Sequence, residues 1–297
     1  MKIKNKAKVV VFGGNGFIGT SLCEKLKRKK FDIYIYDQNI NEEKQGFKFY
    51  QGDLLDKKKI EKVTKDAKYV FHFAGISDIE LSNEDALKTF NTNVLGTITI
   101  LNACLKNKIY RIFFASSIYI YSSKGGFYKI SKQTCESIIK EYSDRFNLKF
   151  TIIRFGSIYG PNSNALNFIY KVISDALNKG IMIRKGDGNE LREYIHVSDA
   201  ANGVIKLLSN RFINAHVMLT GSQKMSIREI LDMINEILGK KIKIKYSGNR
   251  LSSHYKITPY NFEPILAKKV NLDEEIDLGE GIFDLISKVH KKNQLSD

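Results

Sequence analysis

The chain has 297 residues, of which 43% are hydrophobic, so it is long enough for one large domain or two smaller ones with a sizeable core. Lys and Arg total 48 against 32 Asp and Glu, a formal net charge of +16, but the basic residues are mostly Lys and are spread along the whole chain. This spread favours a solvated basic surface that helps to attract anionic small molecules, and argues against a nucleic-acid-binding protein.

The spacing of the cysteines and histidines and the length of the apolar runs limit the class of protein further. The three cysteines have no metal-like spacing and the five histidines form no paired ligand motif, so we expect no metal site and a reduced, cytoplasmic setting. No run approaches the ~20 apolar residues that a membrane span requires, and the basic N-terminus precedes only a short apolar strand. We therefore expect neither a membrane span nor a signal peptide.

The first motif is a glycine-rich turn, GGNGFIG, at residues 13–19. It follows a β-branched run and precedes a helical pattern of apolar residues, so the glycines fall on a strand-to-helix turn. This context predicts a dinucleotide fingerprint, in which Gly13, Gly16 and Gly19 serve the tight turn, the approach of backbone N–H groups to a pyrophosphate, and close helix packing. A flexible loop without a ligand is the alternative, and the flanking elements disfavour it.

Strand and helix patterns alternate through the first half of the chain. We expect strands at Val9–Phe12, Asp32–Tyr36, Phe47–Gln51, Tyr69–Phe73, Arg111–Ser116 and Phe150–Arg154, and long helices at Asn83–Lys106 and Tyr128–Phe146. The alternation predicts an α/β fold, a Rossmann-type doubly wound parallel sheet whose ligand lies beyond the carboxyl ends of the strands.

The alternation loosens after Arg154, which predicts a smaller, interleaved C-terminal substrate-binding domain. The expected dinucleotide-binding domain spans residues 1–156, with elements returning at about 193–220. The substrate-binding domain is expected to comprise residues 157–192 and 221–297.

Two carboxylates follow predicted strands near the glycine turn. Asp37 lies some twenty residues beyond the glycines, where a carboxylate accepts hydrogen bonds from an adenosine ribose and repels a 2′-phosphate. NAD is therefore expected as the cofactor in preference to NADP. Asp53, in the sequence Gly52-Asp53-Leu54, either meets the adenine amino group or caps the next helix, and its spacing alone does not decide between these roles.

The chemistry is expected at the end of the fifth strand, where Ser116 and Ser117 precede Tyr128 and Lys132. Tyr128 and Lys132 are four residues apart and share one face of the predicted helix. A Tyr has an ordinary pKa near ~10, but an ammonium and a nicotinamide cation nearby favour the phenolate, and a serine hydroxyl can orient the same reacting oxygen. Ser117, Tyr128 and Lys132 therefore predict general acid–base catalysis of hydride transfer.

The chain resembles the extended short-chain dehydrogenase/reductases of the nucleotide-sugar epimerase and dehydratase group. The motifs that occur in that family's order are GGNGFIG, Asp37, GDL, HFAG, Asn93 in NTNVLGT, Ser117, YKISK, RFGSIYGP and REYIHVSDA. The resemblance implies that NAD is bound by Gly13, Gly16, Phe17, Ile18, Gly19, Asp37, Asp53, Leu54, Phe73, Ala74, Gly75, Asn93, Tyr128 and Lys132.

The resemblance also implies how substrate and partner are held. Ser117, Ser157 and Arg192 are expected to bind the nucleotide sugar, with Arg192 on its diphosphate. A homodimer is expected to pair through the two long helices, whose apolar residues extend beyond one stripe and include Leu87, Phe90, Val94, Ile98 and Leu101.

Departures from the family pattern limit the reaction. Ile118 and Tyr119 stand where the 4,6-dehydratases have Asp-Glu and the decarboxylases a Glu, so neither elimination nor decarboxylation has its acid or base. Only ten residues separate Ser117 from Tyr128, Ser157 replaces a common Asn, and SSHYKITPY stands near the place of a late Arg-Pro-Gly-Asp element. Together these changes leave room for a bulkier sugar, such as a GDP-linked heptose.

The leading hypothesis is an NAD-dependent 4-epimerase or 4-dehydrogenase acting on a UDP- or GDP-linked hexose or heptose for surface-glycan biosynthesis. The alternative is a redox-sensing regulator that binds the dinucleotide on the same fold without turnover. Such regulators commonly lose the Tyr and Lys, whereas this chain retains Ser117, Tyr128 and Lys132 together.

Overall fold

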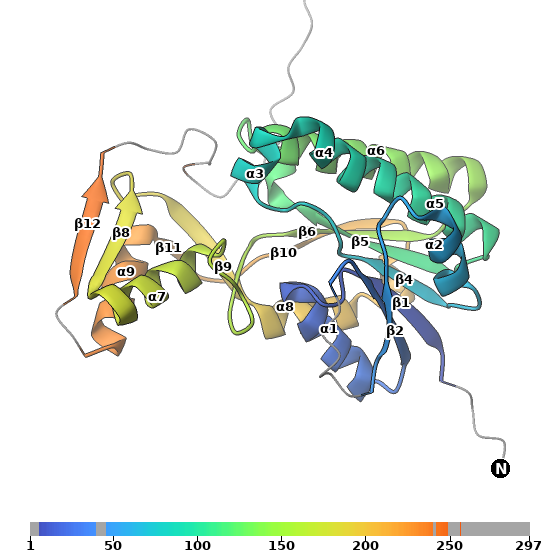
Figure 1. Ribbon diagram of the computed structural model, residues 1–297, viewed down its shortest axis with the longest axis horizontal. Coiled ribbons are helices and arrows are strands. Elements are labelled where there is room, and N and C mark those ends of the chain that lie inside the picture. The colour runs from blue at the N-terminus through green and yellow to red at the C-terminus, as the bar shows by residue number, and fades with distance from the viewer. Residues whose placement is uncertain (1–5, 40–45, 240–241, 249–255, 257–297) are drawn as a thin grey trace, which may run out of the picture. The chain divides into compact units, whose positions relative to one another are not determined.

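A computed structural model of the chain describes residues 6–39, 46–239, 242–248 and 256 (Figure 1). Its strands are β1 (Lys8–Phe12), β2 (Asp32–Asp37), β3 (Lys48–Gln51), β4 (Tyr69–His72), β5 (Arg111–Ser117), β6 (Phe150–Phe155), β7 (Ser157–Tyr159), β8 (Ile181–Lys185), β9 (Leu191–His196), β10 (Ala215–Leu219), β11 (Lys224–Ser226) and β12 (Lys243–Ser247). Its α-helices are α1 (Phe17–Arg28), α2 (Lys57–Thr64), α3 (Ile79–Glu84), α4 (Ala86–Phe90), α5 (Gly96–Lys106), α6 (Gly126–Phe146), α7 (Phe168–Lys179), α8 (Val197–Lys206) and α9 (Ile227–Ile237).

Seven strands form one sheet in the order β10-β6-β5-β4-β1-β2-β3, and every neighbouring pair is parallel. From β1 the chain order runs toward β3 on one side, and from β4 it runs toward β6 and β10 on the other. Doubly wound sheets bind their ligands at this switch point, between β1 and β4. The predicted Rossmann-type α/β fold is therefore confirmed, and each of the six predicted strands differs from the observed one by a single residue at one end.

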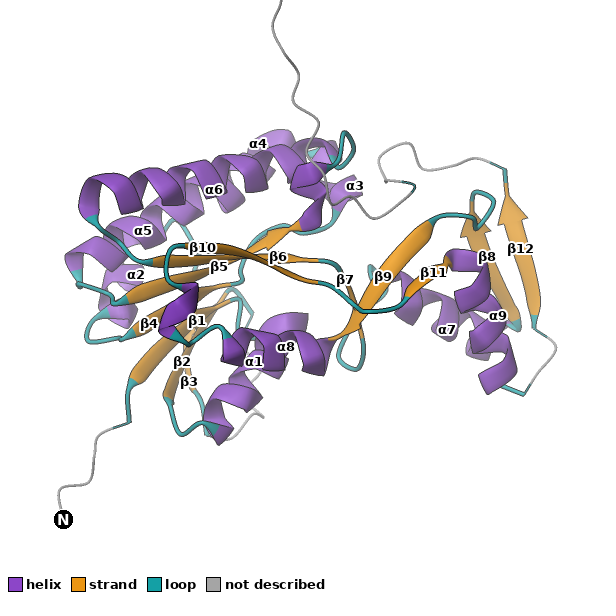
Figure 2. Ribbon diagram, turned by 180° about the vertical axis from the view of Figure 1, so that it is seen from behind, coloured by secondary structure: helices purple, strands orange, loops and turns teal. Residues whose placement is uncertain are grey.

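Helices cover both faces of this sheet, α1 and α8 on one and α2, α5 and α6 on the other (Figures 1 and 2). The alternation of side chains along β1 explains the two layers. Val10 and Phe12 pack into the core under α2, α5 and α6, whereas Val9 and Val11 pack into the core under α1 and α8. A strand that is buried on both faces reads as a continuous apolar run, as KVVVF does.

The helix predicted over residues 83–106 is interrupted in the structure. Asp85 ends α3 and caps α4, with its side chain accepting a hydrogen bond from the Lys88 backbone N–H at 2.8 Å. A π-helical turn at Asn91–Leu95 then joins α4 to α5. The prediction of one continuous helix was therefore wrong, because a short polar side chain competes for backbone hydrogen bonds at Asp85.

The second half of the chain builds smaller elements around their own core. β7, β9 and β11 form a three-stranded sheet, β8 pairs with β12, and a separate apolar cluster includes Val172 of α7, Met182 of β8 and Leu231 of α9. Within residues 193–220, α8 packs on α1 and β10 joins the large sheet. The domain boundaries themselves stay a prediction, and most of residues 249–297 lies outside the described residues.

Among the described helices, none is both long enough and apolar enough to cross a bilayer. Likewise, the described side chains include no group of three or more His, Cys, Asp or Glu placed to hold a metal ion.

His72, at the end of β4, is a buried ionisable group in this core. Its Nε2 lies 2.9 Å from the Thr97 hydroxyl, while its Nδ1 has no hydrogen-bond partner within the described part of the chain. Burial, and to a lesser extent the positive charge of Lys132, lowers the pKa of His72 from 6.5 to about 3. His72 is therefore neutral in the folded protein at pH values where it is protonated in the unfolded chain.

This difference predicts that acid destabilises the fold. Because the folded pKa is depressed, the contribution of His72 is fully present above pH 6.5 and is lost as the pH falls toward 3. From pH 7.5 to pH 5 the loss is about 2 kcal/mol in the free energy of unfolding. Urea unfolding across that range should show a shallower pH dependence in His72→Gln than in the wild type. Equal dependence in the two proteins would remove His72 as the cause.

Candidate active site

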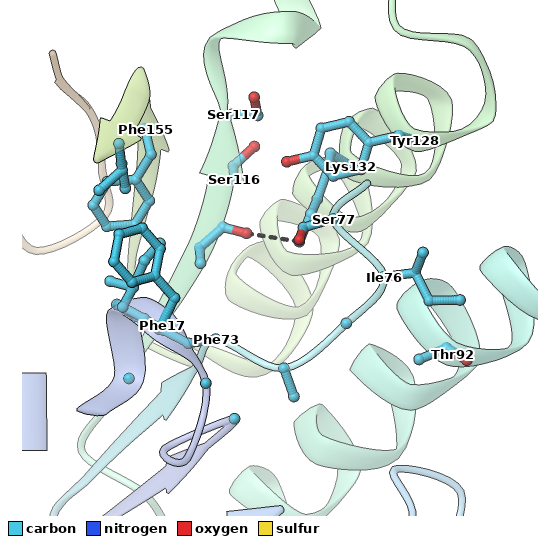
Figure 3. Close-up of a pocket in the computed structure, with 18 of the residues that line it drawn as sticks. Phe17, Phe73, Ile76, Ser77, Thr92, Ser116, Ser117, Tyr128, Lys132 and Phe155 are labelled. Carbon is cyan, nitrogen blue, oxygen red and sulfur yellow. Dashed lines mark hydrogen bonds between the residues drawn. The ribbon is translucent and has the colours of Figure 1, made fainter. Parts of the chain in front are cut away.

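A single cavity of about 590 Å³ lies at the carboxyl ends of β1, β2, β4, β5 and β6, within the usual range of small-molecule sites. Figure 3 shows a close-up of its wall. It brings together most of the residues predicted for cofactor, catalysis and substrate, namely Gly13, Gly16, Phe17, Ile18, Gly19, Asp37, Leu54, Phe73, Ala74, Gly75, Ser117, Tyr128, Lys132 and Ser157. Asp53, Asn93 and Arg192 are not among the residues that line it.

The glycine turn is held so closely that side chains would not fit. A Cβ on Gly19 would lie 2.1 Å from the carbonyl oxygen of Gly13, and a Cβ on Gly13, at φ +76°, would lie 2.6 Å from the backbone nitrogen of Ala74. Gly16 is the N-cap of α1, and no side chain caps this helix terminus. The first backbone N–H groups of α1 therefore suit a pyrophosphate.

Asp37 lines the cavity beside this turn. Its two carboxylate oxygens accept hydrogen bonds from the backbone N–H groups of Asn15, at 3.1 Å, and Asn39, at 3.2 Å. These bonds fix the carboxylate next to the glycine turn, where the fingerprint requires a ribose acceptor.

Asp53 is exposed and does not cap a helix. Its carboxylate accepts hydrogen bonds from the Leu55 backbone N–H and from the Gln38 amide, both at 2.8 Å. The N-cap of α2 is Asp56, whose side chain accepts from the Lys59 backbone N–H at 3.1 Å. The helix-cap alternative for Asp53 was therefore wrong, and its contact with adenine stays a prediction.

The three predicted catalytic residues meet at one wall of the cavity. The Lys132 Nζ donates a hydrogen bond to the Ala115 carbonyl at 2.8 Å and lies 6.0 Å from the centre of the Tyr128 ring. Figure 3 shows the Tyr128 hydroxyl directed toward the end of β5, which carries Ser117. Burial lowers the pKa of Lys132, while nearby Cys135 and the carboxylate of Glu136 act in the opposite direction.

Asn93 lies behind the cavity wall and connects two of its elements. Its side-chain oxygen accepts from the Ile76 backbone N–H at 2.8 Å, and its amide donates to the Ile76 carbonyl and to the Ser131 hydroxyl, each at 3.0 Å. Asn93 thereby holds the loop after β4 against α6, at the residue directly before Lys132. Its predicted contact with NAD stays a prediction.

Arg192 is buried in β9, away from the described cavity wall. Its guanidinium donates to the Leu191 carbonyl at 2.9 Å and to the Lys256 carbonyl at 3.4 Å. Of the SSHYKITPY segment, only Lys256 belongs to the described residues. Arg192 is therefore not among the described residues that share the cavity with Ser117, Tyr128 and Lys132.

The cavity also has wall residues that were given no role from the sequence, although some of them, such as Gly52 and Gly156, lie within the recognised motifs. They are Tyr36, Gln38, Asn39, Gly52, Ile76, Ser77, Ile79, Lys88, Thr92, Ala115, Ser116, Ile118, Tyr119, Phe155, Gly156, Ile158 and Asn167. Tyr119 packs edge-on against Tyr128, with ring centres 6.3 Å apart. Asp37 is the only carboxylate among the described lining residues, and it lies at the glycine turn.

The parallel sheet and its glycine turn define a Rossmann-type dinucleotide-binding protein. The model of the NAD dependent epimerase/dehydratase family matches residues 9–218, most of the chain, and the chain belongs to this family. The predicted family and its cofactor, NAD, are thereby confirmed.

Two kinds of relative illustrate the match. A protein of Methanocaldococcus jannaschii with the provisional name UDP-glucose 4-epimerase is 28% identical, covering 96% of this chain and 99% of its own. Two solved structures share the fold over 86% of this chain and 90% of theirs. They are the UDP-glucose 4-epimerase of Thermotoga maritima with UDP-glucose, at a TM-score of 0.79 and 19% identity, and that of Thermus thermophilus with NAD, at 0.78 and 23%.

Proposed function

We propose that this protein is an NAD-dependent enzyme that oxidises and reduces the C4 hydroxyl of a nucleotide-diphosphate sugar, acting as a 4-epimerase. One observation carries the proposal: Ser117, Tyr128 and Lys132 line the same cavity as the glycine turn and Asp37. The cofactor fingerprint and the acid–base residues are therefore parts of one site. The 4-epimerase name of the archaeal relative supports the same reaction and favours a UDP-linked sugar.

The chain's own residues suit the proton transfers of this reaction. The Tyr128 phenolate takes the proton of the C4 hydroxyl, the Lys132 ammonium favours that phenolate, and the Ser117 hydroxyl orients the same oxygen. When held by the glycine turn and Asp37, NAD would supply the acceptor and donor of the C4 hydride. An epimerase lets the 4-keto sugar turn over between the two transfers, and Tyr128 then gives its proton back to the alkoxide on the other face.

The charge of the cavity argues against the other reactions of the family. Elimination and decarboxylation need a further acid or base beside the sugar, and the only carboxylate among the described lining residues is Asp37, at the glycine turn. Ile118 and Tyr119 line the wall where such a group is expected. A reversible oxidation of the sugar hydroxyl needs no such group.

Substrate binding is proposed for Ser157, which lines the cavity, and for Arg192, whose guanidinium suits a diphosphate. The family motif around Arg192 supports this role. A GDP-linked heptose is the second substrate class that we propose, because Ser157 is smaller than the usual Asn. For either sugar, a role in surface-glycan biosynthesis in the cytoplasm is the setting that we propose.

The first experiment is to denature the freshly purified protein and identify the released nucleotide by chromatography. Stoichiometric NAD or NADH supports an epimerase that retains its cofactor, whereas an empty protein that binds added NAD supports a 4-dehydrogenase. The protein is then incubated with UDP-glucose, UDP-N-acetylglucosamine, UDP-glucuronate and a GDP-linked heptose, and the products are separated from their 4-epimers. Bound NAD with no turnover of any of these sugars would favour the redox-sensing regulator.

Asp37→Ser should relax the cofactor preference. The variant loses a charged hydrogen-bond acceptor for the ribose and the repulsion of a 2′-phosphate, worth about 1.5–3 kcal/mol for the bond alone. We expect the ratio of Kd values for NADP and NAD to fall by about tenfold or more, measured by titration of the cofactor-free protein. Asp53→Ser is the comparison variant for the exposed neighbouring carboxylate. An unchanged ratio in Asp37→Ser would remove Asp37 from ribose recognition.

We also propose that the protein is a homodimer that pairs through α4, α5 and α6. Of the five apolar residues predicted for this surface, Leu87 is 73% exposed, whereas Val94 and Leu101 belong to the core. Exposed apolar side chains that support the proposal are Leu95, at the end of the π-helical turn before α5, and Phe127, Ile130 and Phe146 on α6. A monomeric mass by light scattering at micromolar concentration would contradict it.

A further inference from the structure

We propose that the buried ion pair between Glu136 and Arg154 is a positioning clamp that holds the turn carrying Ser117 at a fixed place relative to Tyr128. The inference rests on the proposed function, in which Ser117 and Tyr128 act on one oxygen. Glu136 and Arg154 do not line the described cavity and are not proposed as catalytic residues.

The turn in question begins at the end of β5 and continues as a 3₁₀ turn, Ile118–Tyr121. Ser117 is the N-cap of this turn, with its hydroxyl accepting from the Tyr119 backbone N–H at 3.2 Å. Ser116, which precedes Ser117, and Tyr121, the last residue of the turn, each form a hydrogen bond with the ion pair. The Ser116 hydroxyl donates to the Glu136 carboxylate, and the Arg154 guanidinium donates to the Tyr121 hydroxyl.

The pair itself is bidentate and shielded from solvent. Arg154 donates from Nη2 to one carboxylate oxygen of Glu136 at 2.7 Å and from Nε to the other at 3.2 Å. The side chains are 17% and 9% exposed. The guanidinium also lies 4.9 Å from the centre of the Tyr121 ring. A planar guanidinium bound in this way has little freedom to move.

Three secondary-structure elements are joined at this point. Glu136 lies on α6, one turn beyond Lys132 and two turns beyond Tyr128, so the three side chains share one face of the helix. Arg154 lies on β6, and Lys132 adds a bond to the Ala115 carbonyl on β5. The helix that carries Tyr128 is thereby tied to the strand end before Ser117 and, through Arg154, to the turn after it.

Stability alone does not explain such a pair. A buried ion pair is often no more stabilising than apolar residues of the same volume, because both charges lose their hydration. Its geometry is restrictive, however, and a displacement of about 1 Å of a reacting group can cost about 10²-fold in rate. An apolar contact would restrict the distance between Ser117 and Tyr128 less tightly than this ion pair does.

The first test compares Glu136→Gln with Glu141→Gln, a matched change on the exposed side of the same helix, where Glu141 pairs with Arg145. In Glu136→Gln we expect kcat to fall about 10- to 100-fold with KM changed less than twofold and bound NAD retained. Glu141→Gln should match the wild type. Ser116→Ala and Tyr121→Phe each remove one hydrogen bond to the ion pair and leave the pair itself intact. These two variants therefore test the clamp even if Glu136→Gln does not fold.

The second readout is independent of turnover. Hydrogen–deuterium exchange of the segment 117–122 should be faster in Glu136→Gln, Ser116→Ala and Tyr121→Phe than in the wild type, and unchanged in Glu141→Gln. Slow exchange in all of these variants would overturn the clamp whether or not a nucleotide sugar is turned over. Faster exchange in the three variants, together with a wild type that turns over none of these sugars, would support the clamp and contradict the proposed function alone.

A double-mutant cycle separates the clamp from a general structural role. In a Ser117→Ala background the residue to be positioned has lost its hydroxyl, so adding Tyr121→Phe or Ser116→Ala should lower kcat by less than twofold. Losses in kcat that multiply in full in that background would overturn the proposal, because they would show an effect that does not pass through Ser117.

Discussion

Tyr128→Phe is expected to lower kcat for the nucleotide-sugar substrate by about 10²–10⁴-fold, the range for loss of a general acid–base group. The variant removes only a hydroxyl from a ring that is 8% exposed and packs edge-on against Tyr119, so the wall of the cavity keeps its shape. The fold and the bound NAD should therefore be retained. Steady-state turnover, circular dichroism and the released nucleotide measure the three quantities.

The matched control is Tyr142→Phe, which removes a hydroxyl from the same helix. The Tyr142 hydroxyl donates to the Asn102 side chain at 2.8 Å, outside the cavity, so turnover should stay within about twofold of the wild type. Turnover by Tyr128→Phe at the wild-type rate would remove Tyr128 from the mechanism. A loss of bound NAD in Tyr128→Phe would instead assign the Tyr128 hydroxyl to cofactor binding.

Gly19→Ala is expected to weaken the binding of NAD. The added methyl group would lie 2.1 Å from the carbonyl oxygen of Gly13 and 2.8 Å from the Cα of Gly14, so the turn and the first turn of α1 must separate. Overpacking of this kind costs roughly 1–3 kcal/mol, and here the distortion falls on the N–H groups offered to the pyrophosphate. We expect the Kd for NAD to rise about 10- to 100-fold in isothermal titration.

Gly248→Ala is the comparison variant for this experiment, because a Cβ at Gly248 meets nothing within 4 Å. Its affinity for NAD should equal that of the wild type. Normal NAD binding by Gly19→Ala would mean that the turn does not need this close approach, and would contradict the assigned role of Gly19.

Patterns within one element, or across two elements that are adjacent in sequence, predicted most of the site. The glycine turn joins adjacent elements, Asp37 ends a strand, and the spacing of Tyr128 and Lys132 places both on one helix face, so each feature depends on distances along the chain. The same reasoning applied to Glu136, a further turn along α6, could have indicated that it faces the same way. It could not have indicated Arg154 or Ser116, which come from other strands.

The sequence by itself determined the fold class and the family and predicted the catalytic side chains, because apolar periodicity and local spacing depend on neighbours in the chain. Only the tertiary structure decided which side chains share a cavity. It brought Ser117 to Tyr128, placed Asn93 behind the wall and Asp53 on the surface, and left Asp37 as the one carboxylate among the described residues of the cavity. These outcomes depend on how helices pack across the sheet, where contacts join residues far apart in sequence, and no local pattern records that packing.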